Sequence, residues 1–222
     1  MFTGIIQEIG VVQKMTPSPL GGELWITSPN IWQKVKKKDS VAVQGVCLTV
    51  VKVIDKACIF TLSPETMRTT NLGKILPGSR VNLELPLSAG DPFGGHFVLG
   101  HTDGMGTVSN MSRAGNAWRL EVSVPDPVER YLVFKGSIAV DGVSLTIASV
   151  EGKNFSAVIL PLTAESTTLQ NTVKGDLVNL EGDIMAKYIF KHMESLSVGK
   201  PEKKAVNEEF LRKYGYLEGL KE

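Results

Sequence analysis

The sequence predicts an all-β protein made of two similar antiparallel barrels in tandem, followed by a C-terminal α-helix. Three observations predict this class. The chain repeats itself after 97 residues, and each half is a series of short segments rich in Val, Ile and Thr. A long helical pattern occurs only near the C-terminus. The 222 residues are 42% hydrophobic and 21% charged, which is ordinary for a globular protein.

The repeat defines the domain organisation. Ser40–Glu84 aligns with Ser137–Glu181 without a gap, and 18 of the 45 positions are identical. Unrelated segments of average composition would share about 3. Upstream, Thr3–Ile5 lies opposite Leu99–His101, with the offset changed by one residue. We expect one barrel over residues 1–92, a second over 93–184, and a C-terminal helix with a charged tail over 185–222.

The strands follow from β-branched segments that glycine-containing turns separate. The expected strands are 40–43, 47–53, 58–63 and 80–85, and their counterparts are 137–140, 144–150, 155–160 and 177–181. About six strands in 90 residues close best as a small antiparallel barrel, because closure removes exposed strand edges.

Short helical patterns interrupt the strands and a longer one follows them. The shorter candidates are 31–37, 63–72, 127–134 and 163–169, of which the second and fourth are also compatible with turns. Residues 183–196 have the apolar stripe of an amphipathic helix, and 202–216 predict a second, charged helix. The amphipathic helix has two uses that the sequence leaves open: it plugs a barrel, or it packs against copies of itself.

Composition excludes several classes of function. The chain has 24 Lys and Arg against 23 Asp and Glu, a net charge of +1, which argues against nucleic-acid or anionic-membrane binding. No apolar run approaches the about 18 residues of a spanning helix, and Met1–Gly10 does not resemble an export signal. The two cysteines are not spaced as a CxxC motif. We therefore expect a cytoplasmic protein.

The first candidate site is the segment Gly94–Gly104, which holds four glycines and two histidines. Gly100 matches Gly4 in the repeat, but His101 replaces Ile5, which suggests that the two halves do different work. The alternative is a glycine-rich turn with solvated histidines. A metal site is not expected, because His96 and His101 are five residues apart and would face opposite sides of a strand.

The second candidate site is a pair of small polar residues repeated in both halves. On a strand, Cys47 and Thr49 share one face, as do Ser144 and Thr146, and such groups can hydrogen-bond the rim of a heterocycle. The alternative for Cys47 is a buried, small apolar residue, and Cys58 is expected in the core.

The third candidate site comprises Pro64–Thr66 and Pro161–Thr163, each of which follows a strand. Their backbone N–H and hydroxyl groups could hold a polyol chain. The alternative is a capped turn, in which Thr66 or Thr163 is the N-cap of a short helix.

Six motifs together resemble the riboflavin synthase family of the alpha-subunit type. They are MFTGII, SVAVQGVCLTV, PETMRTTNL, GGHFVLGHTDGMGTV, SIAVDGVSLTI and VNLEGDIMAKYI, and the similarity runs from Met1 to about Met193. The resemblance implies two six-stranded Greek-key barrels and a helix through which three copies associate as a homotrimer. It also implies the last step of riboflavin biosynthesis, in which one 6,7-dimethyl-8-ribityllumazine transfers a four-carbon unit to another, yielding riboflavin and 5-amino-6-ribitylaminouracil without metal or cofactor.

The resemblance also implies the residues that contact the two lumazines, one in each barrel. In the N-terminal barrel they are Gly4, Ile5, Ile6, Cys47, Leu48, Thr49, Thr61, Leu62, Ser63, Pro64, Glu65 and Thr66. In the C-terminal barrel they are Gly100, His101, Thr102, Ser144, Leu145, Thr146, Val158, Ile159, Leu160, Pro161, Leu162 and Thr163. Lys135 is implied as a contact from the adjacent subunit, because the N-terminal barrel of one subunit is expected to face the C-terminal barrel of its neighbour.

Catalytic roles are hypotheses on the same basis. We expect His101, with Ser144, Thr146 or a bound water, to assist proton transfer at the C7 methyl group, since a histidine titrates near pH 7. Cys47 and Ser40 are expected to polarise the partner lumazine or to supply a transient nucleophile, and Asp183 is a further candidate.

The chain departs from the family pattern at two positions. Gln44 replaces the usual Asn, and Leu162 replaces the Glu that is frequent in the second repeat. Two other functions stay open: a non-catalytic carrier of lumazine or flavin, and a barrel that serves as a binding module. Association with lumazine synthase also stays open.

Overall fold

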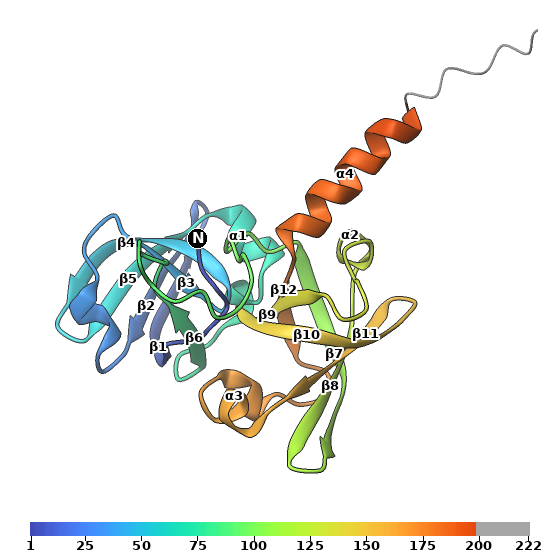
Figure 1. The fold of residues 1–222 in the computed structure, drawn as a ribbon. Helices are drawn as coiled ribbons and strands as arrows, with labels where there is room; N and C mark the ends of the chain where they lie inside the picture. The colour runs from blue at the N-terminus through green and yellow to red at the C-terminus, as the bar shows by residue number, and fades with distance from the viewer. Residues whose placement is uncertain (199–222) are drawn as a thin grey trace, which may run out of the picture. The chain divides into compact units, whose positions relative to one another are not determined.

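The computed structural model of the protein describes residues 1–198, which form two closed six-stranded antiparallel barrels and a C-terminal helix (Figure 1). The predicted fold class is confirmed. Met1–Lys187 form one compact unit that contains both barrels, and α4 from Tyr188 onward belongs to a second unit. The expected helix over 202–216 lies outside the described residues.

The two barrels have the same strand order. The first closes as β1-β2-β5-β4-β3-β6 and the second, in the equivalent order, as β7-β8-β11-β10-β9-β12. The first set is β1 (Glu8–Ser18), β2 (Gly21–Thr27), β3 (Ser40–Val43), β4 (Val46–Ile54), β5 (Ala57–Leu62) and β6 (Arg80–Glu84). The second set is β7 (Gly104–Ala114), β8 (Ala117–Ser123), β9 (Ser137–Val140), β10 (Val143–Glu151), β11 (Asn154–Ile159) and β12 (Leu177–Gly182).

Two of the short helices end earlier than the sequence pattern predicts. The helices are η1 (Ile31–Lys34), α1 (Pro64–Thr69), η2 (Asn71–Lys74), α2 (Asp126–Glu129), α3 (Pro161–Glu165), η3 (Thr168–Asn171) and α4 (Ile184–Val198). The predicted helices 31–37 and 127–134 are therefore wrong in their second halves. Their apolar periodicity reflects buried anchors such as Trp32 and Val128, which a single turn is enough to place in the core.

Each barrel has its own apolar core. Alternate residues of the strands point inward, so that Phe60 and Leu83 are fully buried in the first barrel and Phe155 and Leu180 in the second. Cys58 is also fully buried, as expected. β-bulges occur at equivalent places of both barrels, after Val12 and Val108 and after Val50 and Ile147. These bulges sharpen the bend of the long strands and so help a small barrel to close.

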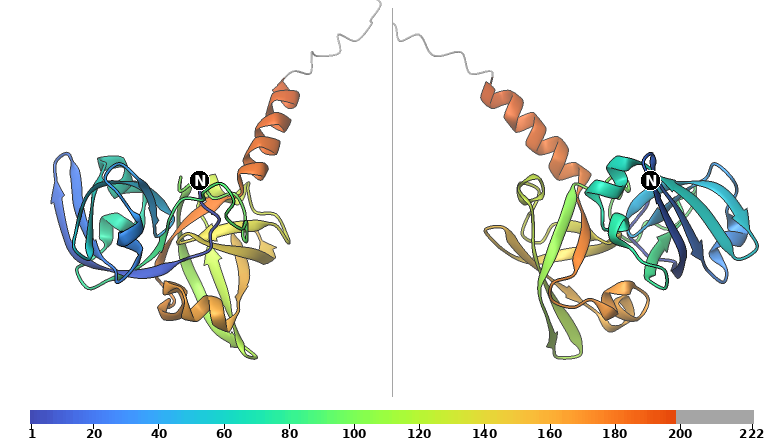
Figure 2. Two further views of the ribbon diagram at one scale, coloured as in Figure 1. Left: turned by 60° about the vertical axis from the view of Figure 1, so that its left-hand side comes forward. Right: turned by 180° about the vertical axis from the view of Figure 1, so that it is seen from behind.

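The two barrels of residues 1–187 lie side by side (Figure 2) and share buried contacts. Phe2 pairs with Val98 in an antiparallel bridge, and the two pack with Ala42 and Ala139 into a third cluster. Asn82 Nδ2 donates to the Asp141 carbonyl and Asn179 Nδ2 donates to the Gln44 carbonyl, each at 2.9 Å. Both amides are buried, so these bonds tie the barrels to one another where water has no access.

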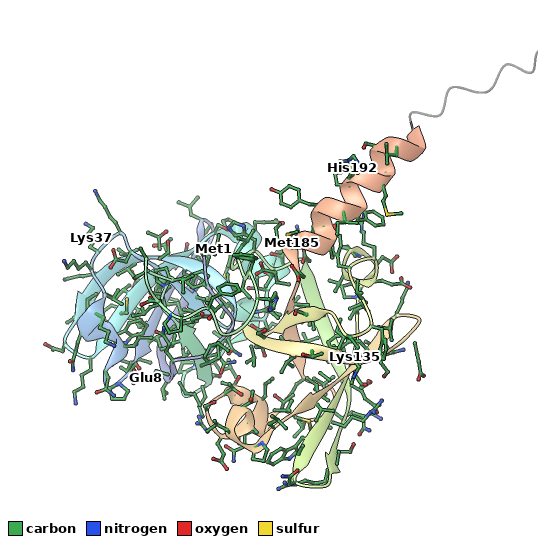
Figure 3. All side chains as sticks on the ribbon, in the orientation of Figure 1. Met1, Glu8, Lys37, Lys135, Met185 and His192 are labelled. Atoms are coloured by element: carbon green, nitrogen blue, oxygen red, sulfur yellow. The ribbon has the colours of Figure 1, made fainter. Side chains whose placement is uncertain are left out.

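α4 is amphipathic, as predicted for 183–196. Its exposed side chains include Tyr188, Ile189, Met193 and Leu196, and His192 is exposed as well (Figure 3). None of the helices in residues 1–198 is long and apolar enough to span a membrane.

Candidate functional site

The segment before β1 (residues 3–6) contacts the second barrel, and the segment before β7 (residues 99–102) contacts the first. We call these two stretches the crossing segments. Ser144 N–H donates to the Gly4 carbonyl, and Cys47 N–H donates to the Gly100 carbonyl, both at 2.8 Å. Ile6 packs against the core of the second barrel. The expected grouping of Gly4 and Ile6 with Cys47, and of Gly100 with Ser144, is therefore wrong. The repeat shows which residues are equivalent, but it does not show whether two equivalent segments have exchanged partners.

Glycine is required where these segments touch the barrels. Gly4 and Gly100 have φ values of 78° and 79°, a backbone conformation that residues with a side chain rarely adopt. A Cβ on Gly4 would lie 2.6 Å from Ser144 Cβ, and one on Gly100 would lie 2.6 Å from Cys47 Cβ. The backbone of each segment thus lies directly against the small polar residue of a barrel strand, and any added atom would push it away.

Two buried glutamates hold the crossing segments. Glu84 accepts hydrogen bonds from Thr3 N, Thr3 Oγ1 and Gly4 N at 2.7–3.0 Å. Glu181 accepts from Leu99 N, Gly100 N and His101 N over the same range. Burial raises the pKa of both carboxyls, to about 7 for Glu181, and the backbone donors partly offset this. The role of these two glutamates is not predicted above, although the repeated VNLE motif is its signal in the sequence.

His96 contacts Ser144. Its Nδ1 lies 2.7 Å from Ser144 Oγ, and the side chain is buried. Among the described residues, nothing accepts or donates a hydrogen bond at Nε2. Burial lowers the pKa of the imidazole and the charge of Asp183 partly opposes this, so the ring is neutral near pH 7 and able to exchange a proton with the serine hydroxyl.

The expected pairing of His101 with Ser144 stays a prediction, because within this chain it is His96 that contacts Ser144. Neither histidine lies in a strand, so the argument that they face opposite sides of one does not apply. His101 is exposed, and its N–H is held by Glu181 in the segment that lies against Cys47. Asp183, by contrast, influences His96 electrostatically and so belongs with Ser144.

Each barrel presents an equivalent outer face. In the first barrel Cys47 and Thr49 of β4 and Thr61 of β5 point out of the core between buried neighbours, and Ser63 and Glu65 at the start of α1 are exposed. In the second, Ser144 and Thr146 of β10 and Val158 of β11 point outward in the same way, and Leu160 and Leu162 at the start of α3 are exposed. We call Cys47, Thr49, Thr61, Ser63 and Glu65 the N-barrel face, and Ser144, Thr146, Val158, Leu160 and Leu162 the C-barrel face.

The remaining predicted contacts divide by burial. Leu48, Leu62, Leu145 and Ile159 point into the barrel cores and can offer a ligand only their backbone. Ser40 pairs with Thr49 across β3 and β4 and is half-buried, so it lies at the edge of the N-barrel face.

The short helices at the ends of β5 and β11 begin differently from the expectation. Ser63, not Thr66, is the N-cap of α1, because its Oγ accepts from Thr66 N at 3.0 Å and Pro64 occupies the first helical position. The N-cap of α3 is Leu160, not Thr163, and its side chain makes no capping bond. Pro64 and Pro161 thus start a helix in both halves, while only the first half has a polar cap.

Lys135 occupies a distinct turn before β9 (labelled in Figure 3). It has a φ of 64°, its N–H donates to the Ile147 carbonyl, and its Nζ lies 5.3 Å from the centre of the Phe134 ring. Its repeat equivalent, Lys38, also has a positive φ, of 79°, and donates to Val50 in the same way. The turn is thus a shared structural feature, and a contact of Lys135 with a neighbouring subunit stays a prediction.

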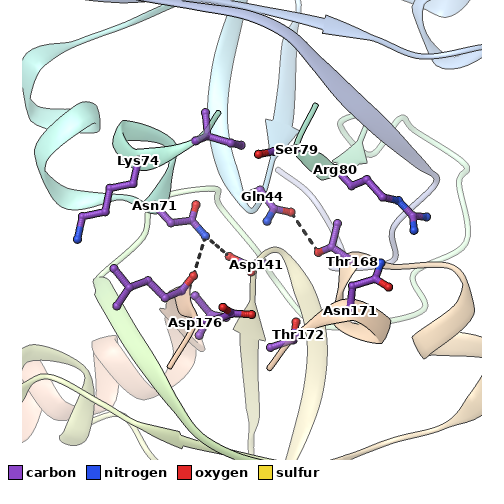
Figure 4. Close-up of a pocket in the computed structure, with 13 residues that line it drawn as sticks. Gln44, Asn71, Lys74, Ser79, Arg80, Asp141, Thr168, Asn171, Thr172 and Asp176 are labelled. Atoms are coloured by element: carbon purple, nitrogen blue, oxygen red, sulfur yellow. Dashed lines mark hydrogen bonds between the residues drawn. The ribbon is translucent and has the colours of Figure 1, made fainter. Parts of the chain in front are cut away.

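Two cavities lie away from these faces. One cavity, of about 770 Å³, lies between the two barrels (Figure 4). Its lining residues include Gln44, Asn71, Asp141 and Thr168, together with Lys74 and Arg80. The other, of about 890 Å³, takes the Ile5 side chain among its lining residues, with Glu8, Ile31 and Lys34. Ile5 therefore turns toward the first barrel although its neighbours Gly4 and Ile6 contact the second.

No cluster of three or more His, Cys, Asp or Glu side chains within residues 1–198 is arranged to hold a metal ion. What the faces offer is small hydroxyl and thiol groups on rigid strands, closely approached by glycine backbone, and one buried imidazole. Such a set can orient a flat polar ring and move a proton.

Comparison with known proteins agrees with this geometry. The family model of the lumazine binding domain matches residues 3–86 and again 99–183. The riboflavin synthase of Bacillus amyloliquefaciens is 34% identical over 97% of this chain and 100% of its own length. That of Mycobacterium bovis is 40% identical over 88% of this chain and 99% of its own. Among solved structures, LumP complexed with 6,7-dimethyl-8-(1'-D-ribityl) lumazine superposes with a TM-score of 0.75 at 26% identity, covering 82% of this chain and 98% of LumP. LumP complexed with riboflavin gives a TM-score of 0.77.

Proposed function

Because the chain belongs to the riboflavin synthase family and carries both of its lumazine-binding domains, we propose that it converts two molecules of 6,7-dimethyl-8-ribityllumazine into riboflavin and 5-amino-6-ribitylaminouracil. The observation that carries the proposal is the match to riboflavin synthases along nearly the full chain, with both repeats present. The enzyme is a transferase, since a four-carbon unit passes from one lumazine to the other.

The duplicated fold suits a reaction between two identical substrates with opposite roles. One lumazine lies on the N-barrel face beside Gly100 and Thr102, and the other on the C-barrel face beside Gly4 and Ile6. Holding two reactants in the right orientation is worth about 7–11 kcal/mol of the barrier. Rigid strands with glycine backbone against them provide such orientation without any cofactor.

His96 and Ser144 carry the proton transfer in this proposal. The neutral imidazole accepts the Ser144 proton while the serine oxygen takes a proton from the C7 methyl of the lumazine on the C-barrel face. The short Nδ1···Oγ distance and the burial of the ring support this role. Thr146 holds the ring of the same lumazine, and Asp183 stabilises the imidazolium that forms.

The N-barrel face provides the second set of groups. Cys47, Thr49 and Ser40 polarise the other lumazine or supply a transient nucleophile to it. His101, held by Glu181 in the segment against Cys47, assists proton transfer there. Lys135 contacts the ligand of an adjacent subunit.

We further propose that three copies assemble through α4 and that each active site forms between an N-barrel face and the C-barrel face of a neighbouring copy. The apolar side chains that α4 exposes support the assembly, because an unpaired helix seldom presents several large apolar residues to water. A mass near three times 24.1 kDa in light scattering is expected. Association with lumazine synthase and a cytoplasmic location stay predictions from the sequence.

The decisive experiment mixes the purified chain with the ribityl lumazine, without added metal or nucleotide, and follows absorbance and products. Riboflavin should appear at one molecule per two lumazines consumed. Tight binding with an unchanged lumazine spectrum would instead support a carrier. The absence of both binding and turnover would overturn the proposal.

A further inference from the structure

The two outer faces differ in polarity at their far ends. Near the crossing segments they match: Cys47 corresponds to Ser144, and Thr49 to Thr146. Further along, polar Thr61, Ser63 and Glu65 correspond to apolar residues in the second barrel. Those residues are Val158, Leu160 and Leu162. All six lie at equivalent places of the fold, at the end of β5 and start of α1 or the end of β11 and start of α3.

The apolar side chains of the C-barrel face are open to a ligand. Val158 is 45% exposed, Leu160 60% and Leu162 77%, whereas Ile159 between them is buried in the core. Val158 lies on the outward side of β11, Leu160 is the N-cap of α3 and Leu162 lies in α3, and none of the three belongs to the barrel's own core. Ile6, which packs on the same barrel, adds another apolar side chain nearby.

The polar groups of the N-barrel face are not all used by the local structure. Ser63 caps α1, which explains that hydroxyl. Thr61 is exposed and caps nothing. Glu65 pairs with Arg68 in a bridge whose two side chains are about 70% exposed, and such a pair rearranges at little cost. The Thr61 hydroxyl and, by rearrangement, the exposed Glu65–Arg68 pair can thus hydrogen-bond a chain of hydroxyl groups.

We propose that only the N-barrel face recognises the hydroxyl groups of the ribityl chain, while the C-barrel face binds its lumazine through the ring and is indifferent to those hydroxyls. This inference rests on the proposed function and adds the specificity of each face. Its physical reason is that a hydroxyl group placed against exposed Leu and Val finds no partner better than water, whereas Thr61, Glu65 and Arg68 offer donors and acceptors.

The test uses ligands that bind without reacting. A 6-methyl-7-oxo-8-ribityllumazine lacks the C7 methyl group and cannot transfer carbon, and 6,8-dimethyl-7-oxolumazine is the same ring with a methyl in place of the ribityl chain. Both are titrated into the full chain by calorimetry. Loss of the ribityl chain should weaken one site by at least about tenfold and the other by less than about threefold.

Reciprocal substitutions assign the sites. Glu65→Leu should reduce the tenfold preference at the discriminating site, and Thr61→Val should do the same. Leu162→Glu should create a preference for the ribityl ligand at the other site. Leu76→Glu is the matched control, because Leu76 is 69% exposed on a turn outside both faces, and it should change neither.

The outcomes separate the two proposals. If both sites lose affinity equally on removal of the ribityl chain, or if Glu65→Leu and Leu162→Glu leave the preferences unchanged, the inference is wrong while the enzyme function stands. If neither ligand binds at any site, the proposed function itself fails, and the inference with it.

Discussion

At the scale of single residues, one or two neighbours decide what chemistry a small polar side chain can perform. Ser144 and Cys47 occupy equivalent positions and both donate their N–H to a crossing glycine segment. Only Ser144 has an imidazole within hydrogen-bond distance. The two halves have therefore kept the same backbone and diverged in proton chemistry, as a reaction with unequal substrate roles requires.

The first prediction concerns His96. His96→Gln keeps a group that can hydrogen-bond Ser144 but cannot take up a proton, so turnover should fall by about 100-fold or more while lumazine binding is kept. The dependence of kcat on pH should lose the limb that the imidazole sets. Steady-state kinetics and calorimetry measure both.

His101→Gln is the comparison. His101 is exposed and its backbone, not its side chain, is held by Glu181, so we expect a smaller loss of turnover with binding spared. Unchanged kcat in His96→Gln, at an unchanged melting temperature, would contradict the role of His96.

The second prediction concerns the buried Asp141. Its Oδ1 accepts from Asn179 N and Asn71 Nδ2, and burial raises its pKa to about 7, with the charge of Asp176 adding to the effect. The folded state therefore binds this proton more strongly than the unfolded chain, whose Asp titrates near 4. The stability that Asp141 contributes is present below about pH 4 and is lost as pH rises through about 7.

Asp141→Asn should abolish this dependence, because the amide keeps the acceptor oxygen and does not titrate. An amide already fills the equivalent role in the first barrel, where Gln44 Oε1 accepts a hydrogen bond from Asn82 N. The variant should become more stable than the native chain as pH rises from 4 to 8, by on the order of 2–4 kcal/mol in urea unfolding. Asp55→Asn, an exposed aspartate with a similar positive φ, should show no such trend. A constant difference across that pH range would contradict the assignment.

At the scale of elements, the crossing segments are the feature that distinguishes this molecule from two separate barrels. Each is an irregular stretch held by one buried glutamate, one glycine contact and one strand N–H. Because these groups are equivalent in both halves, the exchange of partners is symmetric. It brings residues of one repeat next to the substrate face of the other.

The third prediction tests this element. Gly100→Ala introduces a Cβ that would meet Cys47 Cβ at 2.6 Å, in a backbone region that is already unfavourable for alanine. The free energy of unfolding should fall by about 2–4 kcal/mol, since strain and close contact add.

Gly152→Ala separates the two effects. Gly152 also has a positive φ, of 54°, but nothing lies within 4 Å of its added Cβ. We expect a loss of only about 1 kcal/mol from the backbone strain. Equal losses in the two variants would show that the segment does not lie tightly against Cys47.

At the scale of the whole molecule, the barrels within residues 1–187 behave as one body because their contacts are buried. The cluster of Phe2, Val98, Ala42 and Ala139 takes members from both halves, and the Asn82 and Asn179 amides cross between them.

The fourth prediction is that both barrels unfold in one transition. Tryptophan fluorescence from Trp32 should report the first barrel and that from Trp118 the second, each after the other tryptophans are replaced by Phe. The two midpoints should coincide. Phe2→Ala, which empties the shared cluster at a cost of about 3–5 kcal/mol, should separate them. Separate midpoints in the chain with Phe2 intact would contradict the prediction.

The class, the duplication and most strands were predictable from the sequence, because they depend on local alternation, on turn residues and on a repeat that is visible without any knowledge of long-range contacts. The sequence also placed the small polar residues of both faces, since equivalent motifs sit at equivalent strand positions. It overestimated the helices 31–37 and 127–134, where apolar spacing reflected core anchors instead of helical turns.

Which segments contact one another became clear only from the folded chain. The contacts of Gly4 and Gly100 with the opposite barrels, the contact of His96 with Ser144 and the hydrogen bonds of Glu84 and Glu181 join residues 48 to 140 positions apart. Such contacts form because each group satisfies a buried donor, acceptor or gap that exists only once both barrels have closed. A local pattern carries no record of that partner, and so the chemistry of the two faces could be assigned only after the chain had folded.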